Sequence, residues 1–292
     1  MANQTSKITT SEIKKIDALY KAFKVKDLKN DNLLALYKTK KLTISIFKNN
    51  TLLLQGDEKA IFAFNNLSKP KKEKVEKSID GTIGMDEVGT GDYFGPIVTC
   101  SCYVANKDVD KVKALKVDDS KKFDDKRIQT IAKQLKKVVS FAVVGCNPST
   151  YNQFYELYPN INIIKASLHN EALTNLTQSL KNKKYEVYLD QFVSRENYYK
   201  YLKTAKEKAI YIDVIETKAE SKYLAVACAS IIARDAFLTA VDKLSAKAGI
   251  KLPKGSVEKT KIIAAGKKII KKDDLANFAK LNFESITEAI NK

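Results

Sequence analysis

The sequence predicts an α/β fold in which a mixed β-sheet is flanked by helices and preceded by a small α+β domain. From residue 82 onward, two adjacent apolar segments joined by a glycine-rich turn are followed by strands that alternate with helices, which is typical of a mixed sheet. Before residue 68, an amphipathic helix, two short alternating strands and a second helix follow each other closely. These elements are enough for a separate small domain.

The small N-terminal domain is expected over residues 1–67. Apolar side chains recur at helical spacing in residues 11–25, and Ser11 is the expected N-cap of that helix. Apolar and polar residues alternate before an Asn-Asn turn further along, and the apolar stretch "TLLLQG" follows it, as in a β-hairpin. The two strands and the helix that complete the domain are expected over residues 41–48, 51–56 and 59–67.

A linker is expected over residues 68–81, "SKPKKEKVEKSIDG", because this stretch is rich in lysine and has no apolar face. Residues 1–80 carry 17 lysines against 9 acids. This excess suits a domain that binds nucleic acid, although a solvated face without any partner explains the same charge. Both interpretations stay open on charge alone.

The second domain is expected over residues 82–292. Asp124 is the expected N-cap of its first long helix. The strand expected over residues 138–146 is apolar enough to be buried on both faces. The predicted strands lie at 82–88, 96–105, 138–146, 185–192 and 209–216, and the predicted helices include 124–137, 163–183 and 219–244.

The composition favours a polyanionic partner and a reducing compartment. The formal net charge is +18, although a general lysine bias contributes, because only three of the 52 basic residues are arginine. The four cysteines form no C-x-x-C pair and there is one histidine, so a Cys/His zinc site is not expected. With no apolar leader and no run of about 18 apolar residues, we expect a cytoplasmic monomer that does not enter a membrane.

Four acids fall where α/β proteins build their sites. Asp86 and Glu87 end the first strand of the second domain, Asp190 ends a later strand, and Glu220 begins the long helix. Carboxylates without histidine or cysteine favour Mg²⁺ or Mn²⁺, and two such ions can drive phosphodiester hydrolysis. Asp213 and Asp235 compete for the fourth place, and spacing alone does not show that these acids converge.

Several motifs in the second domain resemble those of the type 2 ribonuclease H proteins, and of ribonuclease HIII in particular. The first motif is "GMDEVGTGDYFGPIV", in which Thr90 stands where ribonuclease HII has an arginine. The resemblance covers roughly residues 82 to 290. The further matching stretches are "DDSKKF", "ASLHNEAL", "YLDQF", "TKAESKYLAVACASIIAR" and "LPKG".

The resemblance implies an RNase H-like fold, a TBP-like N-terminal domain that binds substrate, and metal-dependent hydrolysis of the RNA strand of RNA–DNA hybrids. Cleavage by such an enzyme leaves 3′-OH and 5′-phosphate ends. The family's four acidic ligands carry over to Asp86, Glu87, Asp190 and Glu220, with Glu220 fitting the HIII pattern. We expect Asp86 to bridge two Mg²⁺ or Mn²⁺ ions, and the other three acids to complete their ligand sets.

Substrate contacts are expected from two further segments. Gly89, Thr90 and Gly91 are expected to pass close to the RNA strand, although a tight turn alone also explains these glycines. A flanking phosphate is expected at Ser120, Lys121 and Lys122, where a solvated lysine pair is the alternative. His169 is interpreted as a packing or hydrogen-bonding residue and stays outside the catalytic set.

Two other classes of function remain as alternatives. One is a non-catalytic protein that binds hybrids, which the four intact acids argue against. The other is an HII-like enzyme that incises at single ribonucleotides, which Thr90 and Glu220 argue against. A nucleotide-binding P-loop is excluded, because the sequence contains no G-x-x-x-x-G-K-[ST].

Overall fold

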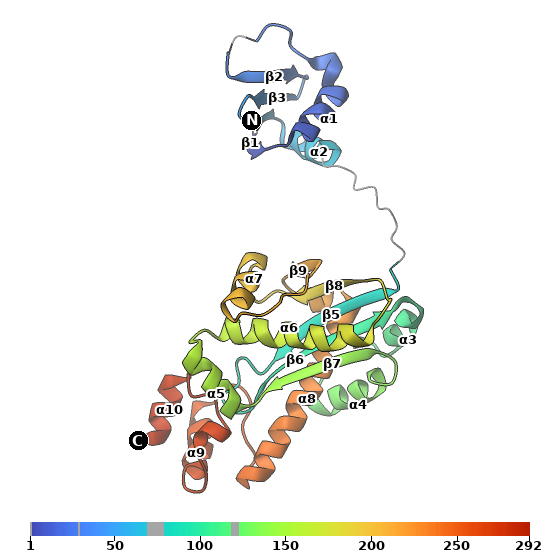
Figure 1. Cartoon of the computed structure of the whole chain (residues 1–292). Helices are drawn as coiled ribbons and strands as arrows, with labels where there is room; N and C mark the ends of the chain where they lie inside the picture. The colour runs from blue at the N-terminus through green and yellow to red at the C-terminus, as the bar shows by residue number, and fades with distance from the viewer. Residues whose placement is uncertain (1, 29, 69–78, 118–122) are drawn as a thin grey trace. The chain divides into compact units, whose positions relative to one another are not determined.

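The computed structural model describes residues 2–28, 30–68, 79–117 and 123–292. The chain divides into two compact units, Met1–Lys77 and Ser78–Lys292, which are drawn in Figure 1. The linker predicted over 68–81 falls mostly on residues outside the described ranges. Each unit is described by itself below.

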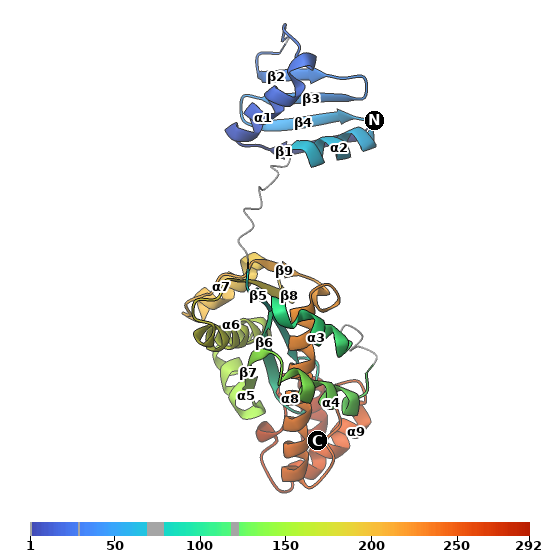
Figure 2. The ribbon, with the colours of Figure 1, turned by 90° about the vertical axis from the view of Figure 1, so that its right-hand side faces the viewer.

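The N-terminal unit is a four-stranded antiparallel sheet with two helices on one face (Figure 2). Apolar side chains of its central strands pack against Ile16 of the first helix and against Ile61 and Phe64 of the second. The strand order is β1-β4-β3-β2. The elements are β1 (Ala2–Lys7), α1 (Thr10–Tyr20), η1 (Lys21–Phe23), β2 (Leu33–Lys38), β3 (Leu42–Phe47), β4 (Thr51–Gly56) and α2 (Glu58–Ser68).

The strands β1 and β2 were not predicted from the sequence, and the cap of the first helix differs from the prediction. β1 is too polar to be recognised by alternation and exists because it pairs along β4. The predicted helix ends early, since the backbone N–H of Val25 donates to Leu36 of β2. The N-cap is Thr9 and not Ser11: Thr9 forms a capping box in which its backbone N–H lies 2.7 Å from the Glu12 carboxylate.

The larger unit is built on a mixed five-stranded sheet of order β7-β6-β5-β8-β9. The first three strands along the chain form an antiparallel meander, and the last two run parallel to β5. This confirms the predicted α/β class with a mixed sheet. The strands are β5 (Gly81–Val88), β6 (Ile97–Ala105), β7 (Ser140–Cys146), β8 (Tyr185–Asp190) and β9 (Val214–Glu216).

Helices cover both faces of this sheet, as Figures 1 and 2 show. One face carries α8 together with α3 and α4, and the other carries α6 with α5 and α7. The C-terminal helices α9 and α10 pack against each other. The bounds are η2 (Asn106–Asp108), α3 (Val109–Ala114), α4 (Asp125–Leu135), α5 (Pro148–Leu157), α6 (Ile161–Ser179), α7 (Arg195–Thr204), η4 (Ala219–Ser221), α8 (Leu224–Ala248), α9 (Lys259–Ile269), η5 (Leu275–Asn277) and α10 (Glu284–Asn291).

Helix α8 lies unusually close to β5. A Cβ atom added at Gly84 of β5 would stand 2.0 Å from the backbone of Ala225 in α8, so only glycine permits this approach. α8 has the length and mean hydropathy, 1.8, of a membrane-spanning helix, and 61% of that window is buried inside the protein. Its packing against β5 and β6 accounts for its apolar composition as that of a core helix.

For the larger unit, the predicted helix cap and buried cysteines are confirmed, whereas two predicted strands and the start of the long helix differ. The Asp124 side chain does cap α4, accepting from Arg127 N at 2.8 Å. All four cysteines are buried free thiols. The strand expected to be buried on both faces, β7, is instead an edge strand whose Phe141 and Val143 are each 36% exposed. The strand predicted over 209–216 is only the three-residue β9, and the long helix begins at Leu224, after the 3-10 turn η4.

Candidate active site

The sheet brings Asp86 and Asp190 to the same edge. β5 and β8 are parallel neighbours, and their register pairs Met85 with Leu189. Asp86 and Asp190 follow these two residues directly, so they lie side by side at the carboxyl ends of adjacent strands. This is the edge at which α/β sheets build their sites.

Glu220 joins this edge through the 3-10 turn η4. The backbone N–H of Ala219 donates to Asp190 Oδ1 at 2.8 Å, which ties the turn to the end of β8. Burial raises the pKa of Asp190, and the neighbouring carboxyls of Glu220 and Glu87 raise it further. Sequence spacing left the convergence of Asp190 and Glu220 open, and the side-chain hydrogen bond between the two carboxyls shows that they are neighbours.

Asp86 is the most deeply buried of the four acids, with 8% of its surface exposed. Burial raises its pKa to about 8, and the charges of Glu87 and Asp190 add to the shift. The Ser230 hydroxyl on α8 and the Glu87 backbone N–H oppose it by hydrogen bonding. In the absence of a bound cation, Asp86 therefore holds a proton at neutral pH.

Glu87 is ionised by contrast, because two basic side chains of α6 hold its carboxylate. Lys165 Nζ lies 2.5 Å from Glu87 Oε1, and His169 Nε2 lies 2.8 Å from Oε2. Burial acts to raise the pKa of Glu87, but the hydrogen bond from His169 and the charges of His169 and Lys165 lower it below its usual value. Lys165 was not among the residues selected from the sequence, and His169 was interpreted there only as a packing or hydrogen-bonding residue.

The donor chemistry of the four acids fits Mg²⁺ or Mn²⁺. All four offer carboxylate oxygens, and their mutual repulsion is relieved by a cation. Within the described ranges, however, no three His, Cys, Asp or Glu side chains are already arranged as a finished metal site. The carboxylates are gathered at one edge but are not arranged around a common ion position.

The two competing acids lie in other surroundings. Asp213 Oδ2 accepts from the backbone N–H of Val187 at 2.8 Å, which is a structural role beside β8. Asp235 of α8 pairs with Lys136, the C-cap residue of α4, at 2.6 Å, and its side chain is 15% exposed. Asp213 therefore stands just before β9 and not inside a strand, and Asp235 bridges two helices and does not lie on an open helix surface, so both predicted placements are wrong.

The glycine loop after Asp86 and Glu87 has two kinds of glycine. Gly89 has φ +91°, and a Cβ there would stand 2.1 Å from Pro96 O, so the turn itself requires it. A Cβ at Gly91 would meet nothing within 4 Å. Between them, the Thr90 hydroxyl oxygen is buried and has no hydrogen-bond partner among the described residues.

The far side of this loop is anchored by the C-terminal part of the chain. Gly255 donates its N–H to Asp92 Oδ1 and accepts from Tyr93 N. Lys280 is fully buried and donates its ammonium to Gly95 O at 2.8 Å. Burial lowers the pKa of Lys280 to about 8. The loop is therefore held rigidly although it carries little secondary structure of its own.

The predicted phosphate contacts Ser120, Lys121 and Lys122 lie outside the described residues. The helix that follows them is nevertheless fixed: Asp125 of α4 pairs with Arg234 of α8 at 2.9 Å and with Lys254. These ion pairs hold the start of α4 close to α8 and to the "LPKG" segment.

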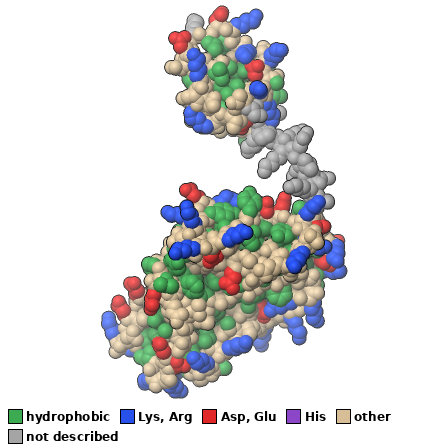
Figure 3. Space-filling view, in the orientation of Figure 1, with side chains coloured by type: hydrophobic (Ala, Val, Ile, Leu, Met, Phe, Trp, Pro, Cys, Tyr) green, Lys and Arg blue, Asp and Glu red, His purple; other side chains and the backbone are tan. Residues whose placement is uncertain are grey.

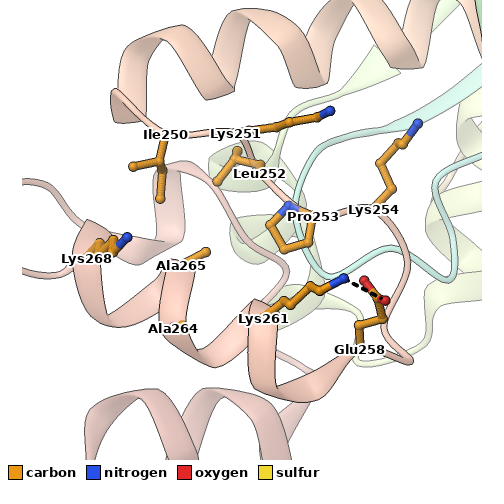
Figure 4. A pocket seen from close by; sticks show the side chains of 10 residues that line it. All are labelled: Ile250, Lys251, Leu252, Pro253, Lys254, Glu258, Lys261, Ala264, Ala265 and Lys268. Carbon is orange, nitrogen blue, oxygen red and sulfur yellow. Dashed lines mark hydrogen bonds and ion pairs between the residues drawn. The ribbon is translucent and has the colours of Figure 1, made fainter.

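A lysine-rimmed groove of about 700 Å³ lies between this segment and α9 (Figure 4). Lys261 on its wall pairs with Glu258 at 3.0 Å. None of the four acids lines it. The lining residues are Ile250, Lys251, Leu252, Pro253, Lys254, Glu258, Lys261, Ala264, Ala265 and Lys268.

A mixed sheet with carboxylates gathered at the ends of adjacent strands defines a phosphoryl-transfer nuclease of the RNase H type. The chain belongs to the ribonuclease HII family, whose model matches residues 83–286. It is therefore an endoribonuclease of the ribonuclease H class.

Individual relatives point to the HIII branch of that family. Ribonuclease HIII of Bacillus cereus (strain ATCC 10987) is 39% identical over 268 residues, covering 85% of each chain. The crystal structure of Bst-RNase HIII in complex with Mn²⁺ superposes with a TM-score of 0.68 at 30% identity, over 99% of this chain and 98% of that one. RNase H3 of Aquifex aeolicus gives 0.57 at 26% identity, over 96% and 100%. The resemblance found in the sequence is confirmed.

The raised pKa of Asp86 makes divalent-ion binding depend on pH. Below about 8 the proton on Asp86 competes with the ion, and above it the competition ends. We expect Mg²⁺ affinity to rise by up to about tenfold per pH unit on approaching pH 8 and then to level off. Isothermal titration calorimetry measures this directly, and a constant affinity through the neutral range would contradict it.

The two glycines should respond differently to alanine. Gly91→Ala should keep the thermal stability of the protein and lower hybrid cleavage by about tenfold or more, because the open space beside Gly91 is expected to receive the substrate strand. Gly89→Ala should destabilise the protein by about 1–3 kcal/mol. Gly145→Ala is the matched control, since a Cβ there makes only an ordinary 3.9 Å contact. Full activity in Gly91→Ala would remove the substrate role.

Proposed function

We propose that this protein is a divalent-metal-dependent endonuclease that hydrolyses the RNA strand of RNA–DNA hybrids, leaving 3′-OH and 5′-phosphate ends. The observation that carries this proposal is the convergence of Asp86, Glu87, Asp190 and Glu220 at one edge of the sheet. The presence of Mn²⁺ in the Bst-RNase HIII structure supports a dependence of this protein on a divalent ion.

Asp86 and Asp190 would hold the ion, with Glu87 and Glu220 completing its surroundings. When bound, the ion activates water and stabilises charge on the phosphate. Asp86 would release its proton on ion binding, and Glu87 would keep its orientation through Lys165 and His169. Four carboxylates would be enough to hold two such ions.

The glycine loop supplies the means to recognise RNA. Gly91 leaves room for a backbone to approach, and a rotation of the Thr90 side chain would bring its unbonded hydroxyl, which is buried in this structure, to a 2′-OH. Ser120, Lys121 and Lys122 are proposed to hold a neighbouring phosphate. Thr90, together with the similarity to ribonucleases HIII, favours continuous hybrids over single embedded ribonucleotides.

The overall charge suits this substrate. Basic side chains are spread over the visible surface of both units in Figure 3, with fewer acids between them, and the net charge is +18. Buried free thiols are typical of a reducing compartment. We further propose that the protein acts as a cytoplasmic monomer without membrane contact.

The N-terminal unit is proposed to bind the hybrid through the sheet face opposite its helices. Apolar residues on one side of the strands pack on α1 and α2, while alternate residues such as the half-buried Leu53 and its buried partner Ser45 point the other way. A sheet face with small and apolar side chains suits the shallow minor groove of a hybrid duplex.

Substitution of Asp86 tests the proposed activity. Asp86→Asn should lower cleavage of a continuous hybrid in Mg²⁺ or Mn²⁺ by about a hundredfold or more, because it removes the central ligand. Asp235→Asn, which changes a neighbouring acid outside the cluster, is the control and should cleave normally. A duplex with one embedded ribonucleotide should be the poorer substrate of the wild type. Near-normal cleavage by Asp86→Asn would refute the assignment.

The role of the N-terminal sheet in hybrid binding can be tested by introducing one negative charge on its face. Leu53→Glu places a negative charge on this face and should weaken hybrid binding by about tenfold, measured by fluorescence anisotropy. Phe62→Glu is the matched control: Phe62 is 69% exposed on α2, on the helical side of the same unit. Equal affinities of the two variants would reject the sheet face as the binding surface.

A further inference from the structure

Two basic side chains, one turn apart on α6, each contact one carboxylate oxygen of Glu87. Lys165 Nζ lies 2.5 Å from Oε1, and His169 Nε2 lies 2.8 Å from Oε2. The four-residue spacing places both on one face of the helix. Because each oxygen has its own partner, Glu87 is fixed in orientation and its charge is compensated.

This arrangement is buried and is backed by one aromatic ring. Lys165 is 6% exposed and His169 is fully buried. Phe192, two residues beyond Asp190, lies under both: Lys165 Nζ is 4.1 Å from its ring centroid, and the His169 ring stacks on it at 5.5 Å. A buried ammonium is costly unless it is paired, so Lys165 is stabilised here by Glu87 and by the ring face.

Among the four acids, Lys165 is paired with Glu87, and its effect on the others passes through that residue. Within the described residues, no lysine or arginine forms an ion pair with Asp86 or Asp190. Both acids interact electrostatically with Glu87. The positive charge of Lys165 thus reaches the site where a divalent ion is proposed to bind.

We propose that Lys165 is an internal counter-cation: it stabilises the acidic cluster while no divalent ion is bound and opposes that ion by charge repulsion. His169 acts as a positioning residue that keeps Glu87 oriented in both states. The inference rests on the proposed binding of a divalent ion by Asp86, Glu87, Asp190 and Glu220. It explains why a cation is buried at a site that must also accept a second one.

The variant Lys165→Met removes the charge and keeps much of the side-chain volume. Its melting temperature in EDTA should fall, because Glu87 loses its counter-charge, and Mn²⁺ should restore it toward the wild-type value. The Kd for Mn²⁺ should fall about tenfold, since single and double positive charges about 5 Å apart repel by that much even in the dielectric of water. Calorimetry and thermal melts in EDTA and in Mn²⁺ give both readouts without an activity assay.

Three further variants separate charge from packing. Lys165→Arg keeps the charge and should retain the wild-type Kd and melting temperatures. His169→Gln keeps a hydrogen-bond donor for Glu87 and should leave the Kd for Mn²⁺ within about twofold. Lys280→Met is the matched control, because Lys280 is also a fully buried lysine but is bonded to Gly95 O. Its melting temperature should change equally in EDTA and in Mn²⁺.

The outcomes are decisive in each direction. If Lys165→Met folds only with Mn²⁺, the ion has replaced the lost charge, as proposed. An unchanged or weaker Mn²⁺ affinity in Lys165→Met, or failure to fold even with saturating Mn²⁺, would overturn the counter-cation role. If the wild type itself shows no Mn²⁺ binding that Asp86→Asn removes, the proposed metal-dependent function fails instead, and the two failures are therefore distinguishable.

Discussion

The mutual repulsion of four carboxylates at one edge of a sheet is the constraint on which the rest of this structure depends. Parallel pairing of β5 and β8 forces Asp86 and Asp190 together, and the turn η4 adds Glu220. Burial then strengthens every charge interaction among them. This repulsion is reduced in two ways: the pKa of Asp86 is raised, which favours its protonated form, and Glu87 is paired with Lys165 and His169. A site with this much repulsion between carboxylates is suited to binding a cation.

Rigid surroundings keep the strained site in place. Gly84 lets α8 lie directly on β5, which brings Ser230 within hydrogen-bonding reach of Asp86. The glycine loop that leaves β5 is tied by Gly255 and Lys280 from the C-terminal region. Segments far apart in the sequence thus converge on one loop. The C-terminal helices matter to the active site through these ties, although they carry none of its acids.

Sequence patterns predicted those features that depend on neighbouring residues in the chain, such as apolar strands and helix caps. The strand end at Asp190 followed from its apolar run, and Asp124 was identifiable as a helix cap, whereas β5 runs two residues past Asp86 to Val88, because Glu87 and Val88 still pair with β6. The polar edge strand β1 was missed because it depends on pairing with β4, and β7 was misjudged because its apolar residues form an exposed edge. The role of Lys165 depends on which strand α6 packs against. Its one sequence signal was a lysine inside a largely apolar helical stretch.

The location of a bound ion tests the account most directly. A crystal of the protein soaked in Mn²⁺ and measured with anomalous scattering reports every manganese position without assumptions about activity. A strong peak is expected between Asp86 and Asp190, with Glu87 and Glu220 around it. A peak elsewhere on the molecule, or none beside Asp86 at a concentration that supports hybrid cleavage, would contradict it.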